Sequence, residues 1–263
     1  MKISTIGIVA AFAAASGVAQ ATVYVNSQFG SFANGNLVGQ GGWTQEQTQT
    51  TLPLQVNGGV VQVVGGQIVN NQDAANLFSA PVVADESFYL ASRLTVTSVP
   101  VTNNPSYILA IKQGTFANVR VAFRAGTAPN TFQVAMRLTG QSQNPFQFSS
   151  DLPLGQAVNV IIAYDAYAGD QNDEIFGYIN PTSSDRGNNS EFASQLNGAN
   201  SDITSLSGVI ISQFGTSSNP TAGVDITSVA VTTTFAEAFA TVPTPGSLAL
   251  LGLGGLVATR RRR

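Results

Sequence analysis

The chain contains no cysteine and no histidine among its 263 residues, and only 10% of those residues are charged. Without cysteine, a disulfide, a thiol nucleophile or a cysteine-ligated zinc site cannot form. Without histidine, serine–histidine–aspartate and cysteine–histidine catalysis are excluded as well. Any catalysis would therefore depend on carboxylates, tyrosine, lysine, arginine or a serine–lysine pair.

Positive charge is scarce between the two ends of the chain. Five of the 11 basic residues, Lys2 and Arg260–Arg263, lie in the terminal segments. Six basic residues then remain against 14 acidic ones, which leaves a net charge of −8 in the middle region. Because phosphate contacts need clustered lysine and arginine, we expect no nucleic-acid partner. The 43% hydrophobic content predicts a folded protein with a mostly neutral polar surface.

Residues 1–21 have the layout of a secretory signal peptide. Lys2 is followed by an apolar run from Ile6 to Ala15, and small residues at Ala19 and Ala21 form an A-x-A pattern. This order of features predicts cleavage after Ala21 and export of the protein. The alternative, a buried N-terminal helix, fits less well because a strand-like sequence begins directly afterwards.

Residues 241–263 form a second terminal segment with three parts in order. The motif Val242-Pro243-Thr244-Pro245 comes first, and an apolar run of 11 residues, 248–258, follows it. As a helix this run measures about 17 Å, short of the roughly 30 Å bilayer core. The residues of the run with the largest apolar side chains are Leu248, Leu250, Leu251, Leu253, Leu256 and Val257. The four arginines Arg260, Arg261, Arg262 and Arg263 close the chain and favour the cytoplasmic side of a membrane.

These three parts resemble a PEP-CTERM sorting signal, with Thr244 where the family usually has glutamate. The resemblance covers about the last 22 residues. It implies a bacterial protein that an exosortase in the inner membrane recognises and processes, in cells that make exopolysaccharide. The alternative is a simple single-span anchor.

Between the two ends, residues 22–240 predict one all-β domain. Short segments rich in Val, Ile, Thr, Phe and Tyr alternate with Gly, Pro, Asn and Ser, which favours an antiparallel β-sandwich over βαβ units. The clearest segments are 59–64, 87–99, 106–112, 119–124, 131–138, 157–167, 174–180, 207–214 and 225–235.

The segments 119–124 and 131–138 predict a hairpin whose two faces differ. With Arg124 placed opposite Thr131, the apolar residues of both strands share one face. Arg120, Arg124 and Arg137 then share the other face with Gln133, which makes them candidates for binding an acidic polysaccharide. The alternative is an ordinary solvated outer face.

Three further stretches, 29–43, 176–181 and 225–238, resemble concanavalin A-like (LamG-like) jelly-roll domains. The resemblance implies two antiparallel sheets of about six strands each, joined by pairing of the first and last strands. We expect either a helix or a long loop at 188–202.

The acidic residues give two candidate chemistries. The E-x-D-x-x-E pattern of jelly-roll glycoside hydrolases is absent, so we expect no catalytic activity. The acidic stretch with Asp165, Asp170 and Asp173 offers oxygen ligands for a structural calcium ion, with an ordinary polar loop as the alternative. We expect no other cofactor. The resemblance to jelly-roll domains implies that Trp43 packs in the core rather than stacks on a sugar.

Together these observations predict an exported, non-catalytic bacterial protein of the cell surface or extracellular matrix. It would be associated with the inner membrane at least transiently through its C-terminal tail. Its partners would be the processing exosortase and exopolysaccharide. Two alternatives remain open: a lectin-like glycan-binding module and a glycoside hydrolase-like enzyme.

Overall fold

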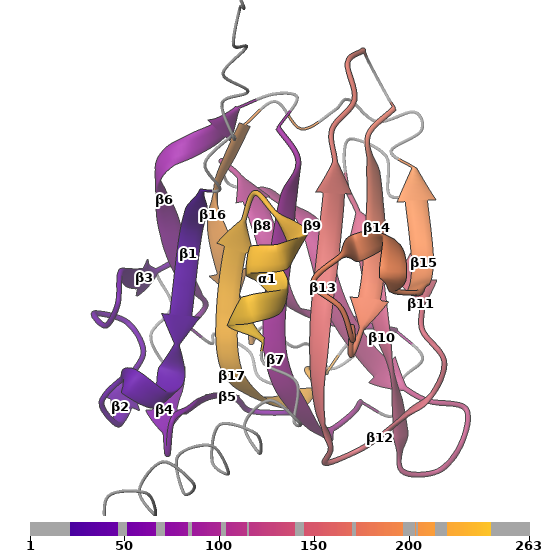
Figure 1. Ribbon diagram of the computed structural model, residues 1–263. Helices are drawn as coiled ribbons and strands as arrows, with labels where there is room; N and C mark the ends of the chain where they lie inside the picture. The colour runs from indigo at the N-terminus through magenta and orange to yellow at the C-terminus, as the bar shows by residue number, and fades with distance from the viewer. Residues whose placement is uncertain are drawn as a thin grey trace, which may run out of the picture.

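The strand segments pair into two stacked antiparallel sheets, which Figure 1 shows in a ribbon view. The computed structural model describes residues 22–46, 52–66, 72–83, 86–100, 104–114, 116–139, 145–169, 172–196, 203, 205–213 and 220–242. These residues form an all-β sandwich of jelly-roll type, which confirms the predicted fold class.

One layer, sheet A, has nine strands. In spatial order its strands are β15 (Glu191–Leu196), β14 (Glu174–Ile179), β13 (Ala157–Asp165), β7 (Phe88–Ser98), β17 (Gly223–Thr232), β5 (Val60–Val63), β4 (Gln55–Asn57) and β2 (Gly35–Asn36), with β1 (Val23–Gln28) also paired to β17.

The other layer, sheet B, has eight strands. In spatial order they are β11 (Gln147–Phe148), β10 (Thr131–Leu138), β9 (Phe116–Ala125), β8 (Ser106–Gln113), β16 (Ser205–Ile211), β6 (Ala74–Val83) and β3 (Trp43–Gln45), with β12 (Leu152–Pro153) also paired to β10. The short helices are η1 (Phe29–Ser31), η2 (Arg186–Asn188) and α1 (Phe235–Thr241).

The first and last strands pair as predicted, with Val25 of β1 opposite Val231 of β17. The strand counts exceed the expected six per sheet because several strands, such as β2, β11 and β12, are only two residues long. This pairing brings the two ends of the described chain onto neighbouring strands.

The hydrophobic core lies between the two sheets and contains Trp43, as predicted. Its side chain is 1% exposed, and its Nε1 donates a hydrogen bond of 3.0 Å to the Ser27 hydroxyl. The ring also lies 6.0 Å from that of Phe29. Because the apolar ring is buried in the core and the indole N–H is hydrogen-bonded to Ser27, Trp43 is not presented to a ligand.

The predicted register of the 119–138 hairpin was wrong by two residues. Arg124 lies opposite Gln133, not Thr131. The loop is shorter than expected because the Gly126 amide donates to the Thr131 carbonyl at 2.9 Å. An even shift leaves every side chain on its predicted face, since side chains alternate with a period of two.

Two segments differ from the sequence-based expectations. Glu191–Leu196 is strand β15, not a helix or loop. The strand predicted to continue to Phe235 ends at Thr232, and Thr234 caps helix α1 by accepting a 3.3 Å hydrogen bond from the Glu237 amide. The T-x-x-E spacing of a capping box was the available signal for this helix.

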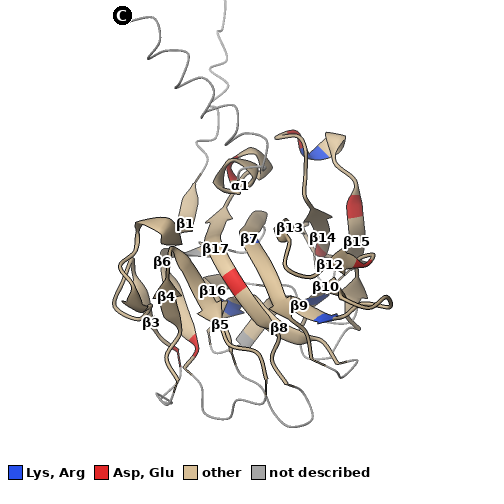
Figure 2. Ribbon diagram, turned by 90° about the horizontal axis from the view of Figure 1, so that it is seen from below, with Lys and Arg blue, Asp and Glu red and all other residues tan. Residues whose placement is uncertain are grey.

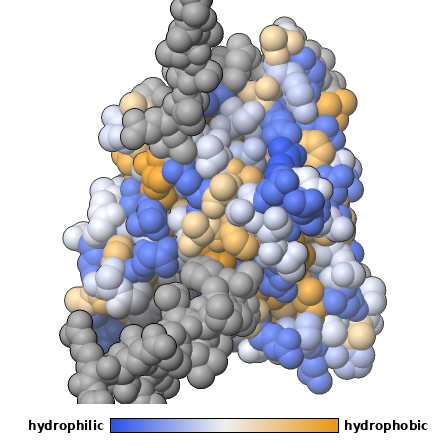
Figure 3. Space-filling model, viewed as in Figure 1, coloured by the Kyte–Doolittle hydropathy of each residue, from blue (hydrophilic) through white to orange (hydrophobic). Residues whose placement is uncertain are grey.

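Helix α1 packs on the outer face of sheet A. Its Phe235 ring makes edge-to-face contacts with Tyr89 and Tyr178, with centroids 5.8 and 5.2 Å apart. Beside the helix, the loop that carries η2 forms a hydrophilic area over β14, seen in the same view in Figure 3. No helix of the described residues covers the opposite outer face, that of sheet B.

Candidate functional site

Three arginines and three aromatic residues gather on the outer face of sheet B, and we call this group with Gln133 the arginine–aromatic face. It arises from simple alternation, because the neighbouring residues of each strand point into the core. The members are Tyr107 of β8, Arg120 and Arg124 of β9, Gln133 and Arg137 of β10, and Phe146 and Phe148 at β11. The structure therefore brings the three predicted arginines together on one surface.

The register aligns these side chains in rows across four strands. Arg120 lies directly opposite Arg137, and the next row contains Ala122 opposite Ala135. Tyr107 and Phe148 flank that alanine row at its two ends. Both alanines are fully buried. Their small size leaves room above the sheet for the long arginine side chains to lie over the middle of the face.

Each arginine stacks on one aromatic ring of the face. The guanidinium carbon of Arg124 lies 3.4 Å from the Phe148 ring centroid. The corresponding distances are 4.4 Å from Arg137 to Phe146 and 4.8 Å from Arg120 to Tyr107. Such contacts place the guanidinium groups over the rings and limit their rotation.

Hydrogen bonds donated by the Nε atoms of two arginines further restrict these side chains. Arg120 Nε donates to the Ala117 carbonyl at 2.9 Å, and Arg124 Nε donates to Gln133 Oε1 at 2.7 Å. The buried Nε of Arg137 makes no hydrogen bond with the described residues. The face is thus largely ordered, with one buried donor that the described residues leave without a hydrogen bond.

The positive charges of the face have no acidic partners among the described residues. Burial lowers the pKa of Arg120 and of Arg137, and the charge of Arg120 lowers the pKa of Arg137 further. Charged residues are sparse throughout the ribbon in Figure 2, where most of both sheets is tan. The described ion pairs, Lys112 with Glu46 and Arg186 with Asp165, lie elsewhere.

A surface pocket of about 360 Å³ opens at one end of this face. Its described lining combines two aromatic rings, two guanidinium groups and one amide, and contains no carboxylate. The lining residues are Asn104, Pro105, Tyr107, Arg120, Arg137 and Phe146. Such a pocket offers flat apolar surfaces beside several hydrogen-bond donors.

Phe146 and Phe148 are not among the residues predicted from the sequence. The F-x-F alternation at 146–148 was the available signal, because two residues with a period of two point to the same side of a strand. The short β11 pairs with β10, with Phe148 opposite Ala135. This pairing places both rings beside the arginines.

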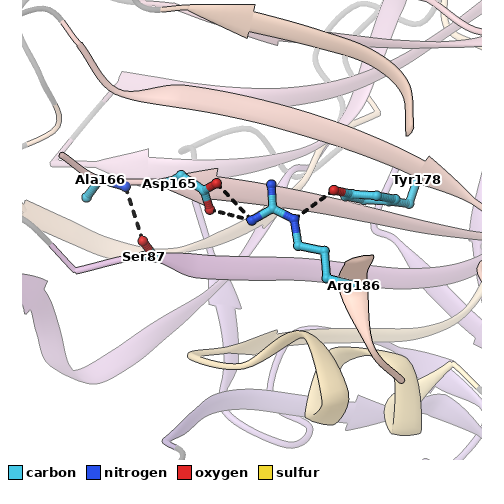
Figure 4. A network of polar contacts seen from close by, with 5 residues as sticks. All are labelled: Ser87, Asp165, Ala166, Tyr178 and Arg186. Atoms are coloured by element: carbon cyan, nitrogen blue, oxygen red, sulfur yellow. Dashed lines mark hydrogen bonds and ion pairs between the residues drawn. The ribbon is translucent and has the colours of Figure 1, made fainter. Parts of the chain in front are cut away.

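Two of the predicted calcium ligands, Asp165 and Asp173, are described, and each accepts hydrogen bonds from protein donors. Both carboxylate oxygens of Asp165 accept hydrogen bonds from Arg186 Nη1, at 2.7 and 2.8 Å, and Arg186 Nε donates to the Tyr178 hydroxyl (Figure 4). These bonds raise the pKa of Arg186 although burial opposes its charge. The described residues contain no group of three or more acidic side chains suited to a metal ion.

Asp173, a second predicted calcium ligand, is buried and bound to protein donors. It accepts hydrogen bonds from the Tyr164 hydroxyl and from the Tyr167 amide. Tyr164 is itself part of the core, stacked on Phe88 with ring centroids 4.8 Å apart. Asp170 lies outside the described residues, so the calcium site stays a prediction.

Most of the two terminal segments also lies outside the described residues. Val242 is described and is 1% exposed, packed beneath α1 with Phe235 and Ala238. The residues from Pro243 to Arg263, with Thr244, Pro245, the apolar run and the arginines, are not described, and neither are residues 1–21. Within the described part of the chain, no helix has the length and apolar character needed to cross a bilayer.

Comparison with known proteins identifies the fold but no family. No protein-family model matches the chain, and no curated protein matches it. Among solved structures, an alginate lyase, Aly36B, in complex with an alginate trisaccharide, has a TM-score of 0.53 and 8% identity, over 79% of this chain and 96% of that one. The carbohydrate recognition domain of Emp47p has a TM-score of 0.50 and 9% identity, over 79% and 94%.

A third similar structure is the CBM2 module of the evolved Dit protein from Lactobacillus casei BL23 phage J-1. It has a TM-score of 0.51 and 10% identity, over 81% of this chain and 96% of that one. At these identities the similarity concerns the fold, which is a jelly-roll β-sandwich in all three.

Proposed function

We propose that this protein is an exported, non-catalytic carbohydrate-binding protein and that its ligand lies on the arginine–aromatic face. The observation that carries the proposal is the pocket between Tyr107, Phe146 and the paired Arg120 and Arg137. Aromatic rings stack on the apolar faces of sugar rings, and guanidinium groups donate hydrogen bonds to the oxygens around them. Among the non-catalytic functions, this pocket favours glycan binding over a purely structural role.

The similar structures support a carbohydrate ligand. Their descriptions name a carbohydrate recognition domain, a CBM2 module and an alginate lyase bound to a trisaccharide. All three share the sandwich of this chain at 8–10% identity. The pocket supplies a specific place for such a ligand in this chain.

The lining of the pocket disfavours glycoside hydrolysis. Glycoside hydrolysis uses two carboxylates, about 5 Å apart in retaining enzymes and about 6.5–9.5 Å apart in inverting ones. No aspartate or glutamate lines the pocket. A hydrolase-like enzyme is the alternative, and detection of shortened chains after incubation with a bound polysaccharide would establish it.

The terminal segments support a place outside the cell. We propose that the signal peptide of residues 1–21 is removed and that the tail of residues 243–263 passes through the inner membrane to an exosortase. The protein then reaches the cell surface or the extracellular matrix. The intact mass of the protein from its native cells tests this. A mass that corresponds to a chain ending near Pro243–Pro245 supports sorting, whereas a mass that corresponds to a chain retaining Arg263 supports a permanent anchor.

Binding is tested by affinity electrophoresis of the full chain in gels that contain a panel of soluble polysaccharides. We expect at least one polysaccharide to retard the protein, and Tyr107→Ala and Phe148→Ala each to reduce the retardation by 5-fold or more. Tyr167→Ala is the matched control, because Tyr167 is exposed but lies outside the face. Retardation that is unchanged in both face variants would contradict the proposed site.

A further inference from the structure

The paired guanidinium groups in the pocket differ from Arg186, the arginine that has a described ion pair. Arg186 is neutralised by Asp165, with 2.7 Å between Nη1 and Oδ1. Arg120 and Arg137 instead lie directly opposite each other on neighbouring strands, and the positive charge of Arg120 lowers the pKa of Arg137. Placing two like charges side by side on a partly buried surface costs free energy, unless a ligand of opposite charge compensates for it.

The described lining of the pocket also offers more hydrogen-bond donors than acceptors. Within the described chain, Arg120 donates a hydrogen bond only through its Nε, to the Ala117 carbonyl. The described residues accept no hydrogen bond from the Nη groups of Arg120 or from Arg137. Arginine donates but cannot accept, and apart from Asn104 and the Tyr107 hydroxyl the lining side chains offer no acceptor. A neutral sugar needs acceptors for its hydroxyl protons, whereas an anionic group only accepts.

The surroundings indicate which kind of anion fits. Tyr107 and Phe146 form two walls of the pocket, so the anionic group must be carried on a body with flat apolar surfaces. The net charge of −8 in the middle region disfavours a polyphosphate such as a nucleic acid, whose dense charge requires many basic contacts. A sugar ring with a single carboxylate or sulfate meets both conditions.

We propose that this pocket binds the anionic group of an acidic polysaccharide, held by both Arg120 and Arg137 while the sugar ring lies against Tyr107. The proposal rests on the proposed function and names its ligand class. Uronate carboxylates and sugar sulfates share the chemistry that a guanidinium fork recognises, namely two oxygens that accept parallel hydrogen bonds. The buried Nε of Arg137 gains a partner when the anion is bound.

The test measures binding of the full chain to three polymers: polygalacturonate, dextran sulfate and uncharged dextran. We expect at least one of the two charged polymers to bind at least 10-fold more tightly than dextran. The double variant Arg120→Gln/Arg137→Gln should remove this preference and reduce the salt dependence of binding. Arg93→Gln, which removes one positive charge from sheet A, is the matched control and should bind like the wild type.

The outcomes separate this inference from the proposed function. If polygalacturonate alone binds, the anion is a carboxylate; if dextran sulfate alone binds, it is a sulfate. Dextran binding equal to that of both charged polymers, or a double variant that retains the preference, would overturn the anion site and leave carbohydrate binding in place. If no polysaccharide of the wider panel binds, both proposals fail. A thermal melt of each variant checks that it is folded.

Discussion

The side-chain amide of Asn159 on β13 donates a 2.9 Å hydrogen bond to the main-chain carbonyl of Val242. The preceding carbonyl, that of Thr241, accepts a 3.1 Å bond from Gln28 Nε2 of β1. Two strands of sheet A therefore hold the end of helix α1, and the Val242 side chain is buried beneath it. The folded domain extends through Val242, and a chain cut beyond this residue keeps all of these contacts.

Truncations at two positions test this boundary. A chain that ends at Val242 should unfold at the same temperature as the full chain, within about 1 °C. A chain that ends at Thr234 loses the burial of Phe235, Ala238 and Val242, which should lower the free energy of unfolding by roughly 3–5 kcal/mol. Thermal denaturation followed by circular dichroism measures both, and equal stability of the two truncated chains would show that α1 is only loosely attached.

Replacement of Arg137 should affect binding much more than stability. Arg137→Met removes one of two adjacent positive charges and the unsatisfied Nε, while its apolar chain still covers Phe146. We expect the free energy of unfolding to change by less than about 1 kcal/mol, in either direction. In contrast, Arg186→Met leaves Asp165 without its partner and should cost about 1–2 kcal/mol. Urea denaturation of both variants at pH 7 makes the comparison, and equal losses would contradict it.

Asp73 should make the protein more stable in mild acid. Its carboxylate is 2% exposed, and burial raises its pKa to about 6, against the opposing effect of hydrogen bonds from the Gln213 amide and the Ser212 hydroxyl. The nearby Glu46, itself paired with Lys112, raises it further. Because the folded pKa lies above the unfolded one, this stabilisation is complete below about pH 4 and is lost as the pH rises through 6.

The size of this effect follows from the pKa difference. At about 1.4 kcal/mol for each unit of pKa, Asp73 contributes on the order of 2–3 kcal/mol between pH 4 and pH 7. Urea denaturation across this range measures it, and Asp73→Asn should remove most of the dependence. If the variant retains the full pH dependence, another group is responsible.

Asp151 should act in the opposite direction, at lower pH. Its carboxylate accepts hydrogen bonds from the Thr127 hydroxyl and from the amides of Thr127 and Ala128, which lower its pKa to about 2 and order the β9–β10 loop. Because the folded pKa is depressed, this stabilisation is present above about pH 4 and is lost as the pH falls through 2. Asp151→Ala should lower the melting temperature at pH 7 but have little effect at pH 2. An equal loss at both values would contradict the charge-dependent role.

The alternation of apolar and polar residues was sufficient to predict the sandwich and the shared face of Arg120, Arg124 and Arg137. The period of two is a local property of an extended chain, so it survives even an error of register, as the shift from Thr131 to Gln133 opposite Arg124 shows. The placement of Trp43 in the core came instead from the resemblance to jelly-roll domains, and the structure confirms it.

The segments that complete this face are distant in the sequence, and only the tertiary structure brings them together. Phe146 and Phe148 reach the arginines only because β11 pairs with β10, and Tyr107 only because β8 pairs with β9. Strand pairing depends on the packing of the whole sheet rather than on the local sequence, as the 191–196 segment also shows by forming an edge strand beside β14. The alternation within each strand dictates which side chains it presents on each face, whereas the order of the strands brings two guanidinium groups and two aromatic rings into one pocket.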